Sequence, residues 1–279
     1  MTETTTTSGS AWKRFWERGG WWKALLLVVV YYGLYQGMSF LIVSPLYAAV
    51  SPEEGSPAFI LLTTALPIAL AIVVLVVFAL SVGWLKELFG PQPIRGSWWM
   101  WIAVAGVLVF NVLHLLTIDY GKAGFEVVAT WLLTGLFIGF AEETLTRGFA
   151  VNLLRKAGYR EFVVALLSSL LFAVLHAGNL FTTDQGPLAT GFQVLYTFFF
   201  GICMYLTLRV TGNLIWPILL HASTDPTIFL SAEYPTESTL ATIGAQGNVV
   251  VILVGLILVW FVRGRVKPKD EFAVEPKLA

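Results

Sequence analysis

The chain has 279 residues, of which 57% are hydrophobic and 12% are charged, and its formal net charge is zero. Soluble domains carry about 25% charged residues, so this composition excludes an ordinary soluble protein and favours a polytopic membrane protein. The balanced charge argues against a nucleic-acid partner. The single cysteine, Cys203, excludes an intramolecular disulfide and a multi-cysteine metal site.

The N-terminal segment is rich in Thr and Ser up to Ser10 and then becomes basic and aromatic. We predict that residues 1–20 form a flexible cytoplasmic segment. The first apolar run that follows is too long for a cleavable signal peptide, so we expect it to act as an uncleaved signal-anchor.

Eight segments approach the length of about 20 apolar residues that a membrane helix needs. In chain order they lie near residues 22–47, 58–80, 98–118, 127–154, 162–180, 188–210, 214–230 and 249–262. Polar residues interrupt the third and the seventh. The predicted fold is therefore all-α, with about eight transmembrane helices. We expect one membrane domain over residues 21–265, a motif core at about 127–230 and a cytoplasmic tail at 266–279.

The distribution of Lys and Arg predicts the orientation of these helices. With the N-terminus in the cytoplasm, 16 basic residues fall on the cytoplasmic side and only Lys122 falls on the other. Basic loops stay inside, so this count favours an even number of helices with both termini cytoplasmic. We expect a multi-pass protein of a bacterial plasma membrane, because the chain is compact and carries no organelle signal.

Two carboxylates and a guanidinium, those of Glu142, Glu143 and Arg147, follow directly after the uncharged run of residues 127–140. Residues four apart stack on one face of a helix, so Glu143 and Arg147 are expected to pair, with Glu on the favourable N-terminal side. Glu142 points elsewhere and has no partner in its own helix. A charge in hydrocarbon costs a few kcal/mol or more, so Glu142 needs a partner or a task. One interpretation is that it activates water for peptide hydrolysis; a polar clamp or an interfacial charge cluster is the alternative.

Two further polar elements lie on later helices. Phe172 and His176 share a helix face, and His221 stacks over Asp225 at the same four-residue spacing. Each also has a structural interpretation, as a hydrogen bond between helices or as a self-satisfied polar pair. Prolines on both sides of the second element predict local unwinding there. The third histidine, His114, is expected to make a core hydrogen bond near Asn111.

The depth of these groups decides whether they can meet. If the fourth helix continues to about Lys156, Glu142 lies about 21 Å from its cytoplasmic end. By the same rise per residue, His176 lies about 24 Å and His221 about 14 Å from the starts of their helices. Helix tilt absorbs this spread, so all three groups can share one level of the membrane.

The three motifs, Glu142-Glu143-x-x-x-Arg147, Phe172-x-x-x-His176 and His221-x-x-x-Asp225, occur in this order on separate predicted helices. They resemble the motifs of the CAAX protease and bacteriocin-processing (CPBP, or Abi) family of intramembrane proteases, which includes the type II CAAX prenyl endopeptidases. The resemblance covers about residues 127–230, and the eight-helix plan extends it to most of the chain.

The resemblance implies a role for each residue of the motifs. Glu142 would be the general base, Glu143 its companion with Arg147, and His176 would orient the water or bind a metal. His221 and residue 225 would stabilise the oxyanion. The family often has Asn at the last position, where this chain has Asp225. An ionised Asp repels an oxyanion, so Asp225 must be protonated there or must instead orient His221 or bind a metal.

Two mechanisms stay open at this point. In one, Glu142 is the base and His221 the donor, with no metal. In the other, Zn²⁺ or another divalent metal is held by Glu142, His176 and His221 and leaves one position for water. The chain lacks the His-Glu-x-x-His motif, so the hypothesis of a bound metal rests only on the types of ligand residue present.

The predicted function is endoproteolysis of a membrane-embedded or lipidated, CAAX-like, protein or peptide within the lipid bilayer. One rival is a non-proteolytic immunity or cell-envelope accessory protein of the same family, which acts by binding. The other rival is a small transporter that uses the buried charges as a proton or ion relay. No inverted repeat is evident, which weighs against the transporter.

Overall fold

The computed structural model describes residues 10–267 of the chain. It begins with the short helix α1 (Ala11–Glu17) and two long crossings of the bundle. The first crossing consists of α2 (Trp21–Met38), the π-helical turn η1 (Ser39–Val43) and α3 (Ser44–Val50). The second consists of α4 (Pro57–Ile60), the π-helical turn η2 (Leu61–Ala65) and α5 (Leu66–Val82), and is followed by α6 (Leu85–Phe89).

The middle of the chain forms the third and fourth crossings. The third consists of the 3₁₀ turn η3 (Trp98–Met100) and α7 (Trp101–Leu116), and is followed by α8 (Tyr120–Ala123). The fourth consists of α9 (Phe125–Glu143), the π-helical turn η4 (Thr144–Ala150) and α10 (Val151–Lys156). The fourth crossing does continue to Lys156, which is the condition on which the predicted depth of Glu142 depends.

Four more crossings complete the bundle. They comprise α11 (Glu161–Ala177) with α12 (Asn179–Thr182), then α13 (Pro187–Thr211), then α14 (Ile215–Glu233), and finally α15 (Thr239–Gly244), α16 (Gly247–Leu258) and the 3₁₀ turn η5 (Val259–Phe261). No β-strand occurs between residues 10 and 267, only two isolated bridges. The predicted all-α fold is confirmed.

Seven helical segments of the described chain are long and apolar enough to cross a membrane, so this is a multi-pass membrane protein. The expected number is about eight, and the segment that does not qualify is α14. It nevertheless passes through the whole bundle. Gly212, before α14, accepts a hydrogen bond from Gln92 at one end, and Tyr234, after α14, accepts one from Asp119 at the other. The polar residues His221, Thr224 and Thr227 of α14 are buried against other helices and are not exposed to lipid. α14 can therefore cross the bundle although its overall hydropathy is low.

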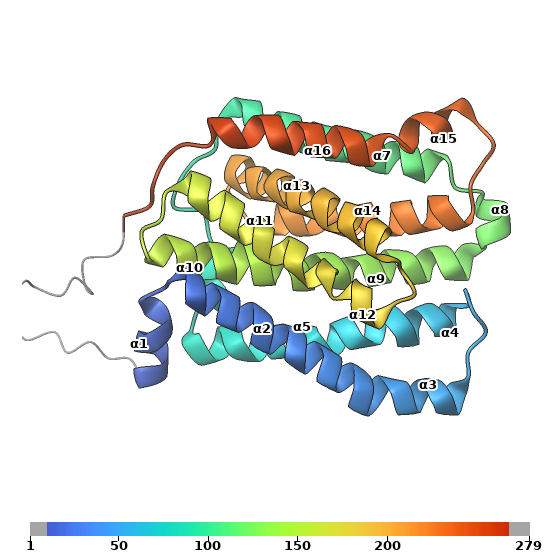
Figure 1. Ribbon diagram of the computed structural model, residues 1–279, viewed down its shortest axis with the longest axis horizontal. Helices are drawn as coiled ribbons and strands as arrows, with labels where there is room; N and C mark the ends of the chain where they lie inside the picture. The colour runs from blue at the N-terminus through green and yellow to red at the C-terminus, as the bar shows by residue number, and fades with distance from the viewer. Residues whose placement is uncertain (1–9, 268–279) are drawn as a thin grey trace, which may run out of the picture.

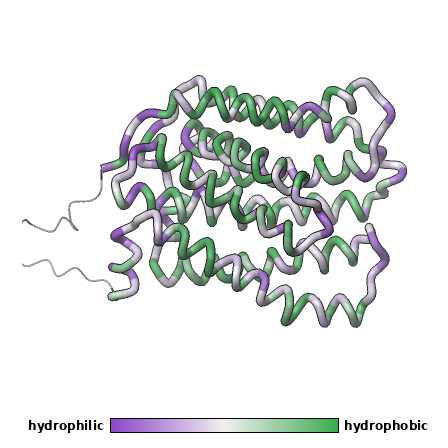
Figure 2. The backbone as a smooth tube through the Cα atoms, viewed as in Figure 1, coloured by the Kyte–Doolittle hydropathy of each residue, from purple (hydrophilic) through white to green (hydrophobic). Residues whose placement is uncertain are grey.

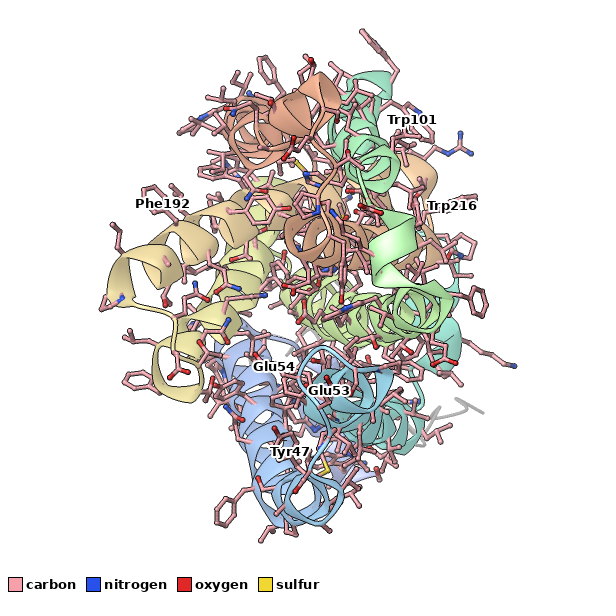
Figure 3. The ribbon with its side chains drawn as sticks, turned by 90° about the vertical axis from the view of Figure 1, so that its right-hand side faces the viewer. Tyr47, Glu53, Glu54, Trp101, Phe192 and Trp216 are labelled. Atoms are coloured by element: carbon pink, nitrogen blue, oxygen red, sulfur yellow. The ribbon has the colours of Figure 1, made fainter. Side chains whose placement is uncertain are left out.

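The two ends of the described chain lie at the same end of the bundle, on the left of Figure 1, and α8 and α15 lie at the opposite end. This arrangement fits an even number of crossings. Figure 2 shows hydrophobic residues along the crossings and hydrophilic ones gathered at the two ends. In the end-on view of Figure 3, the connection that carries Glu53 and Glu54, between α3 and α4, lies at the end opposite α1. That the end with α1 is cytoplasmic stays a prediction.

The contact between α9 and α14 is close because glycine occupies the interface. A Cβ atom on Gly135 would lie 2.2 Å from Cγ of Pro226, and one on Gly139 would lie 2.5 Å from the carbonyl oxygen of Ile218. Small residues four apart allow membrane helices to approach in this way. Pro226 lies inside a continuous helix, so the predicted unwinding around it is wrong. The space left by Gly135 accommodates its ring.

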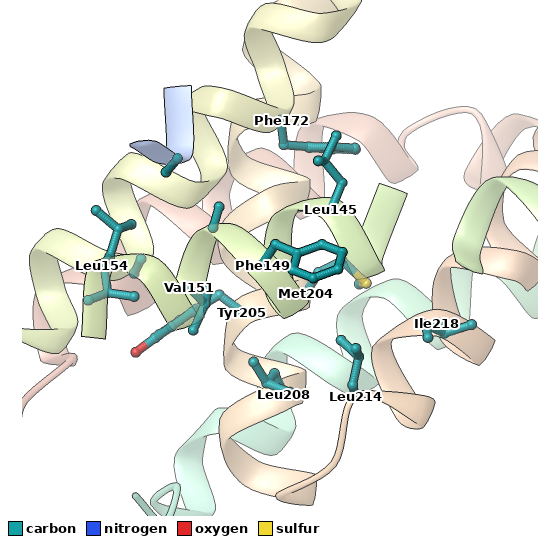
Figure 4. Packing of buried hydrophobic residues seen from close by; sticks show 14 of the residues in the cluster. Leu145, Phe149, Val151, Leu154, Phe172, Met204, Tyr205, Leu208, Leu214 and Ile218 are labelled. Carbon is teal, nitrogen blue, oxygen red and sulfur yellow. The ribbon is translucent and has the colours of Figure 1, made fainter. Parts of the chain in front are cut away.

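The core around the fourth crossing is apolar. Leu145 and Phe149 of η4 are fully buried, and they pack in one cluster with Phe172 of α11, Met204 of α13 and Ile218 of α14 (Figure 4). This cluster holds η4 in the middle of the bundle and therefore fixes the helix that carries the glutamate pair.

A cluster of buried charged side chains lies near the end of the bundle where the described chain begins and ends. Glu161, at the start of α11, accepts hydrogen bonds from Arg155 at 2.7 Å, from Arg209 at 3.1 Å and from the hydroxyl of Tyr205. Arg155 also donates to Gln92 at 2.6 Å. These bonds tie α10, α11, α13 and the α6–α7 connection together, and we assign them a structural role.

The predicted N-terminal segment is described only from residue 10, since residues 1–9 lie outside the described part; the tail is described only to residue 267. Residues 11–17 form α1, and Trp16 is buried. Glu17 accepts hydrogen bonds from Trp84 and from Lys156, both at 2.6 Å. Partial burial works to raise the pKa of Glu17, but these hydrogen bonds outweigh it and hold that pKa below its ordinary value of 4.5.

We predict that the contribution of Glu17 to stability disappears in acid. A carboxyl group whose pKa is lowered by folding stabilises the fold above its unfolded pKa, and this is lost as the pH falls through the folded value. Glu17→Gln should therefore lower the thermal unfolding temperature at pH 7, and the difference from wild type should shrink below pH 4.5. The exposed Glu237→Gln serves as the control. A difference that is equal at both pH values would contradict the assignment.

We predict opposite effects for the same substitution at two glycines. Gly139→Ala places a methyl group against the backbone of α14 and should destabilise the protein by about 1–3 kcal/mol, as overpacking does. Gly191, on α13, has no atom within 4 Å of its ideal Cβ, and Gly191→Ala should stabilise by up to about 1 kcal/mol through helix propensity. Thermal unfolding in detergent measures both. Equal shifts would show that the α9–α14 contact is not close.

Candidate active site

Glu143 lies at the centre of the candidate site and joins two helices. Its side chain is fully buried between α9 and α14. One of its oxygens, Oε1, accepts a hydrogen bond from Nη1 of Arg147 at 3.2 Å and lies 2.8 Å from Nδ1 of His221. A carboxylate only accepts hydrogen bonds, so Nδ1 of His221 is the donor. The pairing with Arg147 follows the predicted spacing, whereas the contact with His221 is not evident from the sequence.

Arg147 is held in place by an aromatic ring and a hydroxyl group. Its guanidinium lies 4.6 Å from the ring centre of Phe172, and Nη1 donates to Oγ1 of Thr146 at 2.5 Å. A Cβ atom on Gly201 would lie 2.7 Å from Nη2, so a glycine leaves room for the guanidinium. Such a cation–π contact in a desolvated position contributes about 2 kcal/mol or more. Arg147 therefore neutralises and fixes Glu143 from within the bundle and does not face the cavity described below.

Glu142 differs from its neighbour because its carboxylate is not fully paired. Its Oε2 atom is buried and has no hydrogen-bond partner in the described part of the chain. The Nε2 atom of His221 lies 3.6 Å away, beyond a hydrogen bond. Yet 23% of the Glu142 side chain is exposed, because it lines a cavity. An unpaired carboxylate in such a position is costly, which makes Glu142 a candidate functional group.

The cavity beside Glu142 has a volume of about 120 Å³. Its polar lining comes from four helices: Tyr31, Tyr32 and Tyr35 lie on α2, Glu142 on α9, His176 on α11 and Asn179 on α12. Its size allows a few water molecules, whose share of liquid volume is about 30 Å³ each. The tyrosines are missed by the motif reasoning, although their hydroxyl groups within an apolar helix are a signal that could have found them.

His176 lines the same cavity as Glu142. Its Nδ1 atom lies 3.1 Å from the carbonyl oxygen of Phe172, and the two rings meet edge to face at 4.9 Å. Since a carbonyl only accepts, Nδ1 is the donor, and Nε2 of the neutral ring is left as an acceptor. The four-residue spacing that predicted a shared face therefore produces a backbone hydrogen bond and a ring contact.

His221 is enclosed by aromatic rings and faces acidic groups. The rings of Phe172 and Phe200 lie edge-on to its imidazole at 5.8 Å and 4.9 Å. Its Nε2 atom lies 3.7 Å from Oδ2 of Asp225 and 3.6 Å from Oε2 of Glu142. The structure thus brings both carboxylates toward the one free nitrogen of this histidine. The aromatic walls limit the directions from which water reaches it.

Asn111 of α7 holds α14 in place through its side-chain amide. The sequence motifs do not predict this contact between the two helices. The amide nitrogen of Asn111 lies 2.9 Å from Oγ of Ser223, 2.9 Å from Oγ1 of Thr224 and 3.3 Å from the carbonyl oxygen of Leu220. These acceptors flank His221 in the sequence. His114, expected to bond near Asn111, instead makes its core contact with the carbonyl oxygen of Gly244, at 3.0 Å.

The π-helical turn η4 begins at Thr144, directly after the glutamate pair. All seven of its residues are buried, and the hydroxyl of Thr146 donates to the carbonyl oxygen of Glu142 at 2.6 Å. π-Helical turns often occur at functional sites. Here the turn begins directly after Glu142 and Glu143 and contains Arg147, which still reaches Glu143 at 3.2 Å.

The predicted metal ligands do not gather in this geometry. Between residues 10 and 267 no three His, Cys, Asp or Glu side chains lie closely enough to hold a metal ion. As arranged here, the set Glu142, His176 and His221 therefore does not fit a metal.

Comparison with known families gives one match. Residues 122–227 match the family model described as "Type II CAAX prenyl endopeptidase Rce1-like". This segment is therefore similar to the Rce1-like family. The match includes all seven motif residues, from Glu142 to Asp225, and confirms the resemblance found in the motifs. At the family level, this match supports a CAAX-type intramembrane protease. No curated protein and no solved structure matches it.

We predict that the two glutamates respond oppositely to neutralisation. Glu143→Gln leaves Arg147 as an uncompensated buried charge and should destabilise the protein by about 3–5 kcal/mol. Glu142→Gln removes a carboxylate whose Oε2 has no partner and should leave stability unchanged or higher. Thermal unfolding in detergent at neutral pH, with the exposed Glu126→Gln as the control on the same helix, measures the difference. Equal loss in both variants would contradict the division of roles.

Proposed function

We propose that the chain hydrolyses a peptide bond of a membrane-embedded or lipidated, CAAX-like, substrate, with Glu142 as the general base. The observation that carries this proposal is the unpaired Oε2 of Glu142. The Glu142 side chain faces a cavity that His176 also lines, and its Oε2 lies 3.6 Å from Nε2 of His221. The Rce1-like match supports the reaction class but does not extend to substrate or catalytic type.

In the proposed reaction, water in the cavity gives a proton to Glu142 while its oxygen attacks the carbonyl carbon of the scissile bond. The carbonyl electrons move to oxygen and form a tetrahedral intermediate. As the intermediate collapses, the C–N bond breaks, and Glu142 passes the proton to the leaving amine. General acid–base catalysis of this kind contributes about 10²–10⁴-fold to rate.

The two histidines take complementary roles in this proposal. His176 has its Nδ1 proton on a backbone carbonyl, so its Nε2 accepts from the water and orients it. His221, as an imidazolium held by Glu143, donates from Nε2 to the developing oxyanion. Fixed donors in a dry site stabilise such charge more than they do in water.

Asp225 orients His221 in this proposal and does not itself bind the oxyanion. Its Oδ2 lies 3.7 Å from Nε2 of His221. An ionised carboxylate at the oxyanion would repel it, whereas a carboxylate beside the imidazolium stabilises the charge of the ring. This assignment accounts for Asp at a position where the family often has Asn.

The proposal predicts that Glu142→Gln abolishes cleavage. Loss of the general base should lower the rate by about 10²–10⁴-fold. We would compare membrane peptide termini by mass spectrometry in cells that express wild type, Glu142→Gln or Glu126→Gln at equal levels. Termini present with wild type and Glu126→Gln but absent with Glu142→Gln would establish proteolysis and identify the bond.

Identical termini in all three strains, under conditions where the gene has a phenotype, would overturn the proposal. If Glu142→Gln then retained the phenotype, the non-proteolytic accessory role would be favoured. If the phenotype instead depended on pH through Glu142 and Asp225, the transporter would be favoured.

A further inference from the structure

The short helix α1 lies across the end of the bundle, whereas the long crossings run along it (Figure 1). Two tryptophans fix α1 to α5. The indole nitrogen of Trp12 donates to Oγ of Ser81 at 3.0 Å, and the ring of Trp16 meets that of Phe78 edge to face at 4.9 Å. α1 is therefore a packed part of the fold, held in the plane of the bundle end.

A tight turn joins α1 to α2 and rests on α10. We call residues 18–20 the α1–α2 elbow. The backbone nitrogen of Gly20 donates to the carbonyl oxygen of Leu153 at 3.0 Å. Gly19 has a φ of +60°, and a Cβ atom there would lie 2.2 Å from the same carbonyl oxygen, so the turn requires glycine. The elbow thus holds the end of α1 and the start of α2 in one arrangement.

The segment from α1 to the first turn of α2 is strongly basic. It contains a single carboxylate, Glu17, against four basic side chains, those of Lys13, Arg14, Arg18 and Lys23. Both oxygens of Glu17 accept hydrogen bonds from outside this segment, one from Trp84 and the other from Lys156. The one carboxylate of the segment is therefore engaged with α10 and does not pair with Arg18 or Lys23.

Lys23 carries the inference because it is a buried cation, with 4% of the residue exposed. Its Nζ atom donates to the carbonyl oxygen of Phe15 and lies 4.5 Å from the ring centre of Phe15 and 5.5 Å from that of Trp22. These contacts supply no negative charge. Between residues 10 and 267 neither Lys23 nor Arg18 forms an ion pair, and the charge of Arg18 acts against that of Lys23. Buried lysines are almost always paired, so this position lacks an anion.

The residues around the elbow place it at the level of the lipid headgroups. The first membrane-crossing segment begins at Trp21, and Trp21 and Trp22 are 54% and 46% exposed. Tryptophan is enriched where hydrocarbon meets water. A helix that lies in this plane and carries basic and aromatic residues is attracted to anionic lipids. The phosphate groups of the membrane lie at the same depth.

We propose that the α1–α2 elbow binds the phosphate group of an anionic membrane phospholipid, with the exposed Arg18 as the direct contact and the buried charge of Lys23 as its support. A guanidinium binds phosphate through two parallel hydrogen bonds. The lipid supplies the negative charge that the segment lacks. This site lies outside the segment that matches the Rce1-like family, and it does not depend on the proposed proteolysis.

A purely structural role for Lys23 is the alternative. A lysine that donates to a carbonyl in the last turn of a helix stabilises that helix through its dipole and needs no ligand. This role explains the contact with Phe15. It leaves the combined charge of Lys23 and Arg18 uncompensated, whereas a bound phosphate neutralises both.

Native mass spectrometry of the full-length protein in detergent tests the site. The probes are phosphatidylglycerol and phosphatidylcholine with identical acyl chains, because both carry a phosphate but only the first has a net negative charge. Wild type should bind phosphatidylglycerol about fivefold or more tightly than phosphatidylcholine, the effect of about one basic residue at an anionic surface.

The variants Lys23→Gln and Arg18→Gln should each lose most of this preference. Lys86→Gln is the control, since it removes one exposed basic residue from α6 near the same end of the bundle and should keep the preference. Arg18 is exposed, so Arg18→Gln tests the site even if Lys23→Gln fails to fold. Equal binding of the two lipids by wild type, or a full preference in both variants, would overturn the proposal and leave Lys23 as a cap of α1.

Thermal unfolding distinguishes a lipid from a free anion. Phosphatidylglycerol should raise the Tm of wild type more than phosphatidylcholine does, because a ligand that binds only the folded state stabilises it. Inorganic phosphate should give no such rise. An equal rise with inorganic phosphate would show that the elbow binds a free anion and would overturn the assignment to a membrane lipid.

Discussion

The rest of the site depends on one buried side chain, Glu143 of α9, which contacts Arg147 of η4 and His221 of α14. Neither the Glu143 carboxylate nor the Arg147 guanidinium could stay charged in the membrane interior without the other. Together they join two crossings of the bundle and hold Nδ1 of His221 as a hydrogen-bond donor to Glu143. The glycines of α9 make this contact geometrically accessible, since they bring the backbone of α14 close to the glutamate pair.

The two adjacent glutamates have separate roles because neighbouring positions on a helix diverge by about 100°. Glu143 faces the packed interior and is neutralised there. Glu142 faces a cavity, where its Oε2 lacks a hydrogen-bond partner within the described chain. The bundle thus pairs one carboxylate inside the packed interior and leaves the other beside a cavity. The rings of Phe172 and Phe200 lie edge-on to His221, between these carboxylates and the apolar core.

The first two crossings add to the site features that lie outside the family match. α2 supplies three tyrosines, Tyr31, Tyr32 and Tyr35, to the cavity beside Glu142. Ile68 of α5 lines the same cavity. The family match therefore includes the motif residues but only part of the lining of the cavity that Glu142 faces.

The sequence by itself determined the all-α membrane fold and the local pair Glu143–Arg147, because apolar length and four-residue spacing act within one helix. It also indicated six residues of the Rce1-like motifs. Only the tertiary structure decided that His221 contacts Glu143, 78 residues away, that Asn111 supports α14, and that Tyr31 faces Glu142. Such contacts depend on the rotation and depth of separate helices, which are set by packing across the bundle and leave no spacing pattern in the chain.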